Sequence, residues 1–324
     1  MKDAIRKNST ILVTYLMAVA LLILCAIVRP GYLNVDNIRT LSSQVAVLGL
    51  VTLGQALVIL TGGMDLSVPW MFTMAGFLMA NLSNGDNGKI AYVIPIVLVI
   101  GIAMGLFNGV GVAYVGIAPV VMTMASNIIF QGLLVGSFNG MPGGSSPSVM
   151  KSLATGSVGA FNNLFLIWLA VSAVALVALY RMPFGRRLYA VGSNEKVAQF
   201  SGVNVKVVKA AAYALSGLTA ALAGILYSGS LGQLYLGMGD EYQMQSIAAV
   251  AIGGISLVGG SGSYVGAMAG TLIIIILNGV LAAVNISEGA QRIVYGVVLF
   301  IAVLISTRRN NMRLVQVKKT TENS

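Results

Sequence analysis

The chain has 324 residues, of which 57% are hydrophobic and 9% are charged. A soluble domain carries about 25% charged residues, so this composition excludes an ordinary soluble protein, and its hydrophobicity excludes a disordered one. Histidine is absent and Cys25 is the only cysteine, which excludes imidazole chemistry, an intrachain disulfide and a thiolate metal cluster. The composition indicates a polytopic membrane protein, for which we expect no cofactor, no metal and no catalytic residue.

The net charge of +10 is gathered between the apolar segments. Lysines and arginines cluster before the first apolar run, in the polar stretch 181–209 and in the tail 307–324. Cytoplasmic segments of membrane proteins are enriched in these residues, so all three clusters are predicted to be cytoplasmic. A nucleic-acid partner is not expected, because no aromatic residues are interleaved with the charges as stacking platforms.

Apolar stretches predict about ten membrane-spanning helices, since each span needs about 20 apolar residues. The expected spans are 10–28, 38–61, 68–82, 90–113, 117–137 and 162–180, followed after the polar stretch by 210–229, 243–258, 264–284 and 289–306. Six spans and then four place both termini and the stretch 181–209 in the cytoplasm. Spans 68–82 and 243–258 are short and are expected to be half-helices or re-entrant segments, so between about eight and eleven spans are compatible with the sequence. We expect a single transmembrane domain over residues 1–324.

Two segments of this predicted topology have alternative interpretations. The run 10–28 is predicted to be a retained helix, because it is longer than the roughly 7–15 apolar residues of a signal peptide and no small-residue cleavage site follows. The connection 138–161 is rich in glycine, proline and serine. It is expected either to cover the external mouth of the protein or to be a plain connecting loop.

Two glycine-rich breaks interrupt the apolar pattern, one in each half of the chain. Diglycines allow sharp turns, and broken helices at matching positions in two halves are typical of transporter cores. Ser67 is predicted to N-cap the helix that follows the first break, and Asp65 is either a functional intramembrane acid or a second cap. The predicted gating residues of these breaks are Gly62, Gly63, Asp65, Ser67, Gly259 and Gly260.

Other glycines recur every four residues. Residues 101, 105 and 109 form one such series, and residues 262, 266 and 270 form another. Small residues at this spacing share a helix face and allow two backbones to approach closely, so both series predict helix packing.

Uncharged polar residues within the spans are candidates for a translocation path. Thr123, Asn127 and Gln131 are spaced four apart and share one helix face. Such a face suits a hydroxylated, uncharged solute, but interhelical hydrogen bonding explains it equally well. The candidate path residues are Gln44, Gln55, Asn108, Thr123, Asn127 and Gln131.

The polar stretch contains a short helix, predicted between residues 193 and 202. A serine or asparagine suits its N-cap, a glutamate suits its first turn, and a glycine is expected to end it. Val197 and Phe200 share one face, which is either a docking surface for a partner or a face that lies on the membrane. The residues assigned to this helix are Ser193, Asn194, Glu195, Val197, Ala198, Phe200, Ser201 and Gly202.

Three motifs resemble the ribose-type sugar ABC importer permeases, which are related to branched-chain amino-acid permeases. Residues 62–68, GGMDLSV, resemble the family pattern GG-I-DLSVG. Residues 190–209 resemble a cytoplasmic A-x-G-x-N…SGI-x-V…K motif, and residues 248–263 resemble AAVVLGG-S-GG-GS. Pro69 stands where the family usually has glycine, and Gln131 stands where it commonly has arginine.

This resemblance implies how transport is driven. It implies a second permease chain, identical or paralogous, a periplasmic binding protein that delivers the solute, and two cytoplasmic ABC ATPase domains that dock on the helix at 193–202. The sequence has no G-x-x-x-x-G-K-[ST] motif, so ATP hydrolysis is expected on a partner and the chain is not expected to be an enzyme. The expected function is import of a monosaccharide or similar polyhydroxylated solute through a bacterial inner membrane, in contact with lipid.

Two alternatives remain open at the level of the sequence. The first is an ABC permease for branched-chain amino acids or nucleosides. The second is an ion-coupled secondary carrier that works without an ATPase, for which Asp65 is the clearest buried acid.

Overall fold

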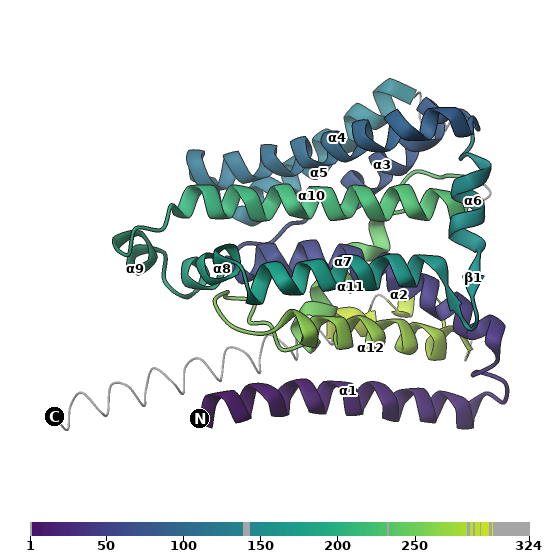
Figure 1. Cartoon of the computed structure of the whole chain (residues 1–324), viewed down its shortest axis with the longest axis horizontal. Helices are drawn as coiled ribbons and strands as arrows, with labels where there is room; N and C mark the ends of the chain where they lie inside the picture. The colour runs from purple at the N-terminus through teal and green to yellow at the C-terminus, as the bar shows by residue number, and fades with distance from the viewer. Residues whose placement is uncertain are drawn as a thin grey trace.

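The computed structural model describes residues 2–138, 143–231, 233–283, 286–287, 289–291, 293–297 and 300. These residues form an all-helical bundle with one short antiparallel hairpin (Figure 1). In chain order the elements are α1 (Lys2–Val28), α2 (Val35–Leu60), α3 (Val68–Ser83), η1 (Asn87–Lys89), α4 (Ile90–Val110), η2 (Gly111–Val115), α5 (Pro119–Phe138), α6 (Ser148–Thr155), β1 (Ser157–Val158), β2 (Phe161–Asn162), α7 (Asn163–Tyr180), α8 (Pro183–Ser193), α9 (Glu195–Phe200), α10 (Val205–Ser230), α11 (Asp240–Ile252) and α12 (Tyr264–Ala283).

Seven helical segments in the described part of the chain are long and apolar enough to cross a membrane. They correspond to the predicted spans at 10–28, 38–61, 90–113, 117–137, 162–180, 210–229 and 264–284. The two short predicted spans are present as α3 and α11. The last predicted span, 289–306, lies largely outside the described residues, of which 289–291, 293–297 and 300 are helical.

One predicted boundary was wrong. The span 243–258 is helical only to Ile252, because Gly253 packs so closely on the next helix that an added Cβ would lie 2.4 Å from the backbone nitrogen of Ala267. Gly254 then turns the chain at a φ of +80°. The connection 138–161 is more than a loop, since it contains α6 and the β1–β2 hairpin.

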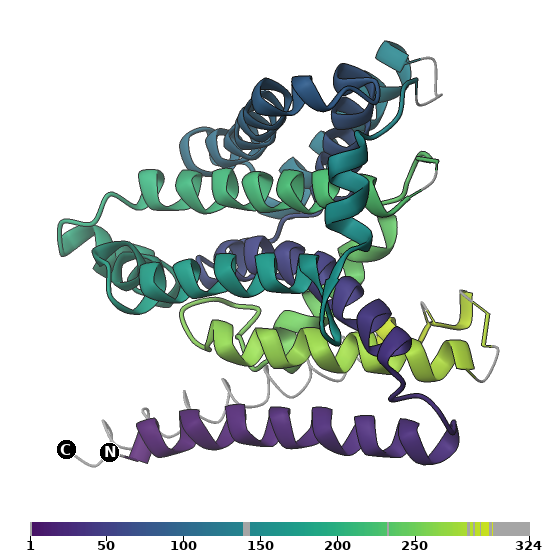
Figure 2. The ribbon, with the colours of Figure 1, turned by 45° about the vertical axis from the view of Figure 1, so that its right-hand side comes forward.

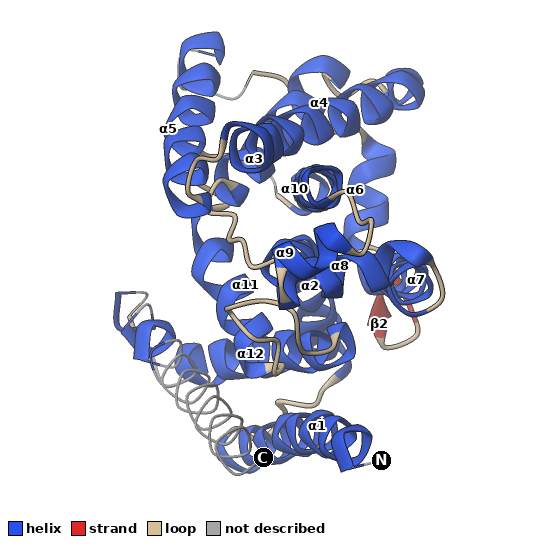
Figure 3. Ribbon diagram, turned by 90° about the vertical axis from the view of Figure 1, so that its left-hand side faces the viewer, coloured by secondary structure: helices blue, strands red, loops and turns tan. Residues whose placement is uncertain are grey.

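Helix α10 lies at the centre of the bundle and packs against α2, α3 and α4 (Figure 3). Helix α1 lies at one side, where it packs on α12 (Figures 1 and 2). The basic segments α8 and α9 lie at one end of the long helices, and α6 and the hairpin lie at the opposite end. We call these the basic end and the hairpin end.

The predicted glycine series mark close helix contacts, except that Gly262 lies in the loop before α12 at a φ of +123° and packs on Ile255. A Cβ added to Gly101 would lie 2.7 Å from the carbonyl oxygen of Gly217. A Cβ added to Gly105 would lie 2.2 Å from the carbonyl oxygen of Tyr213. Gly109 similarly meets Ala210, so α4 and α10 touch backbone to backbone along three turns. On α12, Gly266 and Gly270 make the same kind of contact with α11 and its C-terminal turn. Glycine at these positions allows an approach that any side chain would block.

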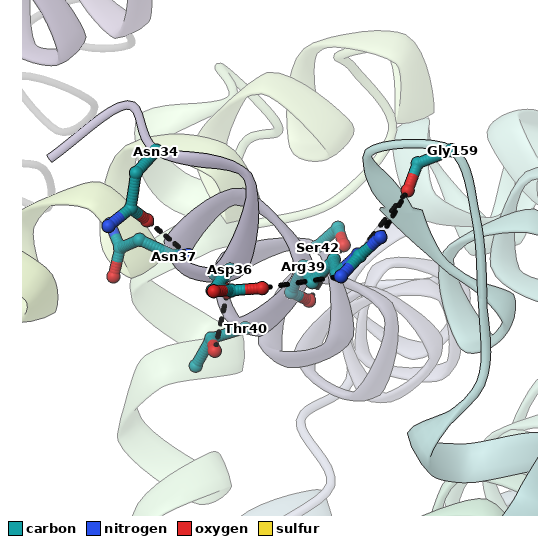
Figure 4. A network of polar contacts seen from close by, with 7 residues as sticks. All are labelled: Asn34, Asp36, Asn37, Arg39, Thr40, Ser42 and Gly159. Atoms are coloured by element: carbon teal, nitrogen blue, oxygen red, sulfur yellow. Dashed lines mark hydrogen bonds and ion pairs between the residues drawn. The ribbon is translucent and has the colours of Figure 1, made fainter. Parts of the chain in front are cut away.

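Polar contacts fix the start of α2 at the hairpin end (Figure 4). The Asn34 side chain caps the helix by accepting from the backbone N–H of Asn37 at 2.7 Å. Arg39 pairs with Asp36 at 3.2 Å and donates to the carbonyl oxygen of Gly159 in the hairpin turn at 3.1 Å. Ser42 then accepts from the N–H of Asn162 at 3.0 Å. These bonds join α2 to the strand that leads into α7.

Candidate functional site

The linker between α2 and α3 returns into the bundle from the basic end and carries a buried carboxylate. Asp65 is 1% exposed. Its Oδ1 accepts from the N–H of Ser67 at 3.0 Å and from the Ser67 hydroxyl at 2.6 Å, and its Oδ2 accepts from the Ser216 hydroxyl of α10 at 2.8 Å. A buried carboxylate is tolerated only when its oxygens are satisfied, and these three bonds satisfy both.

Helix α4 contributes a fourth group to this cluster. Asn108 is fully buried, and its Nδ2 donates to the Ser67 hydroxyl at 2.7 Å. The residues Asp65, Ser67, Asn108 and Ser216 therefore form one polar cluster that joins the linker to α4 and α10, which we call the Asp65 cluster. It holds an extended, non-helical segment in the interior of the bundle.

Ser67 does not act as the side-chain cap that the sequence predicted. It occupies the N-cap position of α3, but its hydroxyl donates to Asp65 and makes no capping bond. A capping hydroxyl must accept from a backbone N–H, but the Ser67 oxygen accepts from the Asn108 amide instead. Asp65 is likewise more than a local cap, because it also binds Ser216, which is 151 residues away in sequence.

The structure brings some of the predicted path residues together and separates others. Thr123 of α5 is buried, and its hydroxyl lies 3.4 Å from the carbonyl oxygen of Met64, next to the Asp65 cluster that contains Asn108. Gln55 is fully buried on α2, and neither polar atom of its side chain has a hydrogen-bond partner within the described residues. Burial along the predicted polar face of α5 falls from Thr123 through the half-buried Asn127 to the exposed Gln131, and Gln44 is also exposed. The six residues therefore do not line one continuous surface.

The sequence did not identify the partners that α10 and α11 supply. Ser216 binds Asp65, and the Tyr213 hydroxyl lies 3.4 Å from the carbonyl oxygen of Met64. The Gln243 side chain of α11 donates to the carbonyl oxygen of Leu66 at 2.7 Å. A polar residue on the packed face of an otherwise apolar helix is the available signal, but spacing alone does not say which distant group it will meet.

At the basic end, α9 is a short helix that projects from the bundle, as predicted, but it is shorter than residues 193–202. Its N-cap is Asn194, whose Oδ1 accepts from the N–H of Val197 at 3.1 Å, and Ser193 is instead the last residue of α8. Gly202 follows the helix at a φ of +80°, a conformation that favours glycine. Ser201 is bonded to the carbonyl oxygen of Val197 within the same turn.

One face of α9 is apolar and open to solvent. Phe200 is 90% exposed and Val197 is 59% exposed, whereas Ala198 is buried against the bundle. Glu195 forms an ion pair with Lys209 at the start of α10, which fixes the orientation of α9. A groove of about 700 Å³ lies between α9 and the connection from η2 to α5, and α9 lines it with Glu195 and Gln199 rather than with the apolar face.

Helix α8 anchors this region to the loop between α11 and α12. The Tyr189 hydroxyl donates to the carbonyl oxygen of Gly262 at 3.2 Å, and the Tyr180 hydroxyl lies 2.6 Å from that of Ser263. Burial, with Tyr180 as a smaller contribution, raises the pKa of the Tyr189 phenol above its ordinary value. The phenol therefore remains a protonated donor at neutral pH.

Comparison with known proteins places the chain in a family. The family model described as the permease component of branched-chain amino acid transport systems matches residues 37–303. The ribose import permease protein of Haemophilus influenzae is 35% identical, with 88% of this chain and 90% of the relative covered. No solved structure matches the chain.

Other relatives are named for different substrates. The galactose/methyl galactoside import permease protein of Escherichia coli is 32% identical, over 94% of this chain and 98% of the relative. The autoinducer 2 import system permease protein of Escherichia coli is also 32% identical, over 90% of this chain and 85% of the relative. The chain therefore belongs to this family of ABC importer permeases and is a multi-pass membrane protein.

Proposed function

We propose that the chain is the membrane-spanning subunit of a binding-protein-dependent ABC importer in a bacterial inner membrane, and that it carries a monosaccharide or a similar polyhydroxylated solute inward. The named substrates of its relatives, ribose, galactose or methyl galactoside and autoinducer 2, support this solute class. Buried hydroxyl and amide groups such as those of Thr123, Asn108 and Gln55 can exchange hydrogen bonds with sugar hydroxyls without the cost of burying further charge.

The observation that carries the proposal is α9. A phenylalanine that is 90% exposed at the basic end of a membrane protein contributes little to packing within the described part of its chain. Exposed aromatic residues are typical anchors of protein interfaces, which supports a partner in the cytoplasm. We assign α9 as the docking site of an ABC ATPase subunit, which would hydrolyse ATP on behalf of this chain.

The remaining parts of the system follow from this assignment. Both termini and the stretch 181–209 are proposed to be cytoplasmic, in agreement with the positive charge of these segments. The opposite, hairpin end would then receive the solute from a periplasmic binding protein. Residues 1–324 are proposed to act as one permease domain that pairs with a second permease chain and has two ATPase domains beneath the pair.

The broken helices suggest how docking affects the path. Helices α3 and α11 are shorter than the full spans, and the linker before α3 is held by the Asp65 cluster. Breaks between helices can act as hinges, because the helical hydrogen-bond ladder is interrupted there. We propose that movement of the linker 61–67 opens and closes the path.

Reconstitution tests this function directly. The chain is placed in proteoliposomes with its ATPase and binding protein, and uptake of labelled D-ribose, D-galactose and L-leucine is measured with and without ATP. We expect sugar uptake that needs both partners and ATP. Uptake driven by a proton or sodium gradient with the chain alone would contradict the proposal.

A permease for branched-chain amino acids is the second candidate, because the description of the matched family names that solute class. ATP-dependent uptake of L-leucine without uptake of either sugar would favour it. The same experiment therefore separates the two solute classes.

A further inference from the structure

Three backbone segments from distant parts of the chain meet at the basic end, next to the docking helix. They are the end of α2 with its following turn (residues 60–62), the end of α8 (residues 192–193) and the loop between α11 and α12 (residues 258–260). We call this contact the glycine junction. The loop N–H of Gly260 donates to the carbonyl oxygen of Leu60 at 3.1 Å, and the Ser193 hydroxyl donates to the carbonyl oxygen of Gly260 at 3.2 Å.

The junction leaves no room for side chains at its glycines. A Cβ added to Gly192 would lie 1.8 Å from the carbonyl oxygen of Leu60 and 2.5 Å from the nitrogen of Gly260. A Cβ on Gly260 would lie 2.5 Å from the backbone of Ser193, and one on Gly259 would lie 2.7 Å from the nitrogen of Gly62. The three segments are therefore in direct backbone contact, and none can move toward another without displacing it.

Two routes lead from this junction to the Asp65 cluster. Along the first, the chain runs from Leu60 through Gly62 and Gly63 to Asp65 itself. Along the second, the loop 253–263 leads back into α11, whose Gln243 binds the carbonyl oxygen of Leu66. Both routes thus start at the glycine junction, which includes residues 192–193 just before α9, and both end on the linker between α2 and α3.

We propose that Gly192 and Gly260 are positioning residues, which transmit the displacement of α9 to the linker 61–67 and so couple the ATPase to the path. This inference rests on the proposed function, because it takes α9 as the docking site. Gly192 transmits the displacement by steric contact of its backbone with Leu60. Gly260 transmits it through its hydrogen bonds to Leu60 and Ser193.

Hydrogen–deuterium exchange on the complete complex tests this role. The permease, its ATPase and its binding protein are purified together in nanodiscs, and exchange is measured without nucleotide and with ATP plus orthovanadate. In the wild-type complex we expect nucleotide to change exchange in both α9 and residues 61–67. In Gly192→Ala and Gly260→Ala, α9 keeps its change, whereas the change at 61–67 falls by about two- to thirty-fold, the range found for substitutions that alter coupling.

Matched variants separate coupling from general damage. Gly132→Ala on α5 is the control, because an added Cβ there meets no atom within 4 Å and is expected to leave both responses as in the wild type. A second pair needs no backbone shift: Ser193→Ala removes the bond to Gly260, whereas Thr271→Val removes a buried hydroxyl bond within α12. Ser193→Ala is expected to reduce the response at 61–67, and Thr271→Val to retain it. This pair decides the question if the glycine variants do not fold.

Each outcome has a definite meaning. If α9 responds to nucleotide but residues 61–67 do not respond in the wild type, or if the junction variants behave like their controls, the coupling role is wrong while the proposed function stands. If the ATPase does not copurify with the wild-type permease, the proposed function itself fails. The inference then fails with it.

Discussion

Asp65 keeps a carboxylate inside an apolar bundle because two serines and a backbone N–H satisfy it. The carboxylate in turn holds the linker 61–67 in place, where a turn at 61–62 is followed by residues that lie outside any helix. The cost of burying the acid is thus balanced by bonds that exist only when α10 and the linker are correctly placed. A carboxylate here fixes the position of the linker more strictly than an apolar residue would.

Replacement of this acid tests that role. In Asp65→Asn, the amide nitrogen cannot accept from the groups that now donate to one carboxylate oxygen, which costs about 1–3 kcal/mol of unfolding free energy and mispositions the linker. We expect a lower thermal unfolding midpoint and reduced ATP-dependent uptake in proteoliposomes. Asp86→Asn, which alters an exposed acid that binds Gly88 in a surface turn, is the control and should change neither value. Normal uptake by Asp65→Asn would make the carboxylate dispensable.

Phe200 raises the opposite question, because it is apolar and yet exposed. In Phe200→Ala we expect the fold to be unchanged and ATPase binding to weaken by about 2 kcal/mol, or roughly 30-fold, as for an aromatic interface anchor. Titration of the ATPase against the permease in nanodiscs measures this effect. Phe161→Ala, at an exposed aromatic position in the hairpin, should bind the ATPase normally. Equal binding by both variants would remove α9 from the interface.

Residue roles were predictable from the sequence where the interaction is local. Asn194 was one of two candidate caps for α9. It was predictable because the N–H that it binds, that of Val197, is only three residues further along the chain. The partner of Asp65 on α10 was not predictable, because a lone serine in an apolar helix gives no information about which distant segment it faces. The same is true of Gln243, whose partner Leu66 lies in the other half of the chain.

At the scale of the elements, glycine decides which helices approach most closely. The series on α4 leaves three positions without a side chain on the face that meets α10, and Gly266 and Gly270 of α12 do the same toward α11. Dispersion contacts between helices in lipid depend on such close approach, because no hydrophobic effect operates between them there. The glycine spacing predicted that these faces pack, although it could not identify their partners.

Gly105→Ala measures the value of this packing. The added methyl group would lie 2.2 Å from the carbonyl oxygen of Tyr213, so α4 and α10 must separate. We expect a loss of about 1–3 kcal/mol in stability, as for overpacked cores, seen as a lower unfolding midpoint in detergent. Gly136→Ala on α5, where an added Cβ meets nothing within 4 Å, should melt like the wild type. A Gly105→Ala midpoint equal to that of the control would contradict the backbone contact.

Element boundaries were predicted well where hydropathy changes sharply, as at the ends of α2 and α7. They were predicted poorly where the chain turns inside the apolar region. The sequence from 243 to 258 reads as one apolar run, but Gly253 and Gly254 end α11 early, because α12 occupies the space that a longer helix would need. Hydropathy indicates that a segment is in an apolar environment, but it does not indicate where the chain turns within that environment.

For the whole molecule, orientation in the membrane is the main prediction. In a Cys25→Ser background, Phe200→Cys and Val158→Cys place single thiols at exposed positions of the basic end and the hairpin end. A membrane-impermeant maleimide should label Phe200→Cys only in inside-out vesicles and Val158→Cys only in right-side-out vesicles. Labelling with the opposite pattern would reverse the proposed topology and place α9 out of reach of a cytoplasmic ATPase.

The position of α11 has a consequence for the surface of the molecule. Its first residues, Asp240 and Glu241, are exposed, and the preceding Gly239 packs on the backbone of Pro69 in the first turn of α3. Acidic side chains would destabilise a surface that faced hydrocarbon. We therefore propose that this flank of the chain faces water or another protein chain and not the acyl chains.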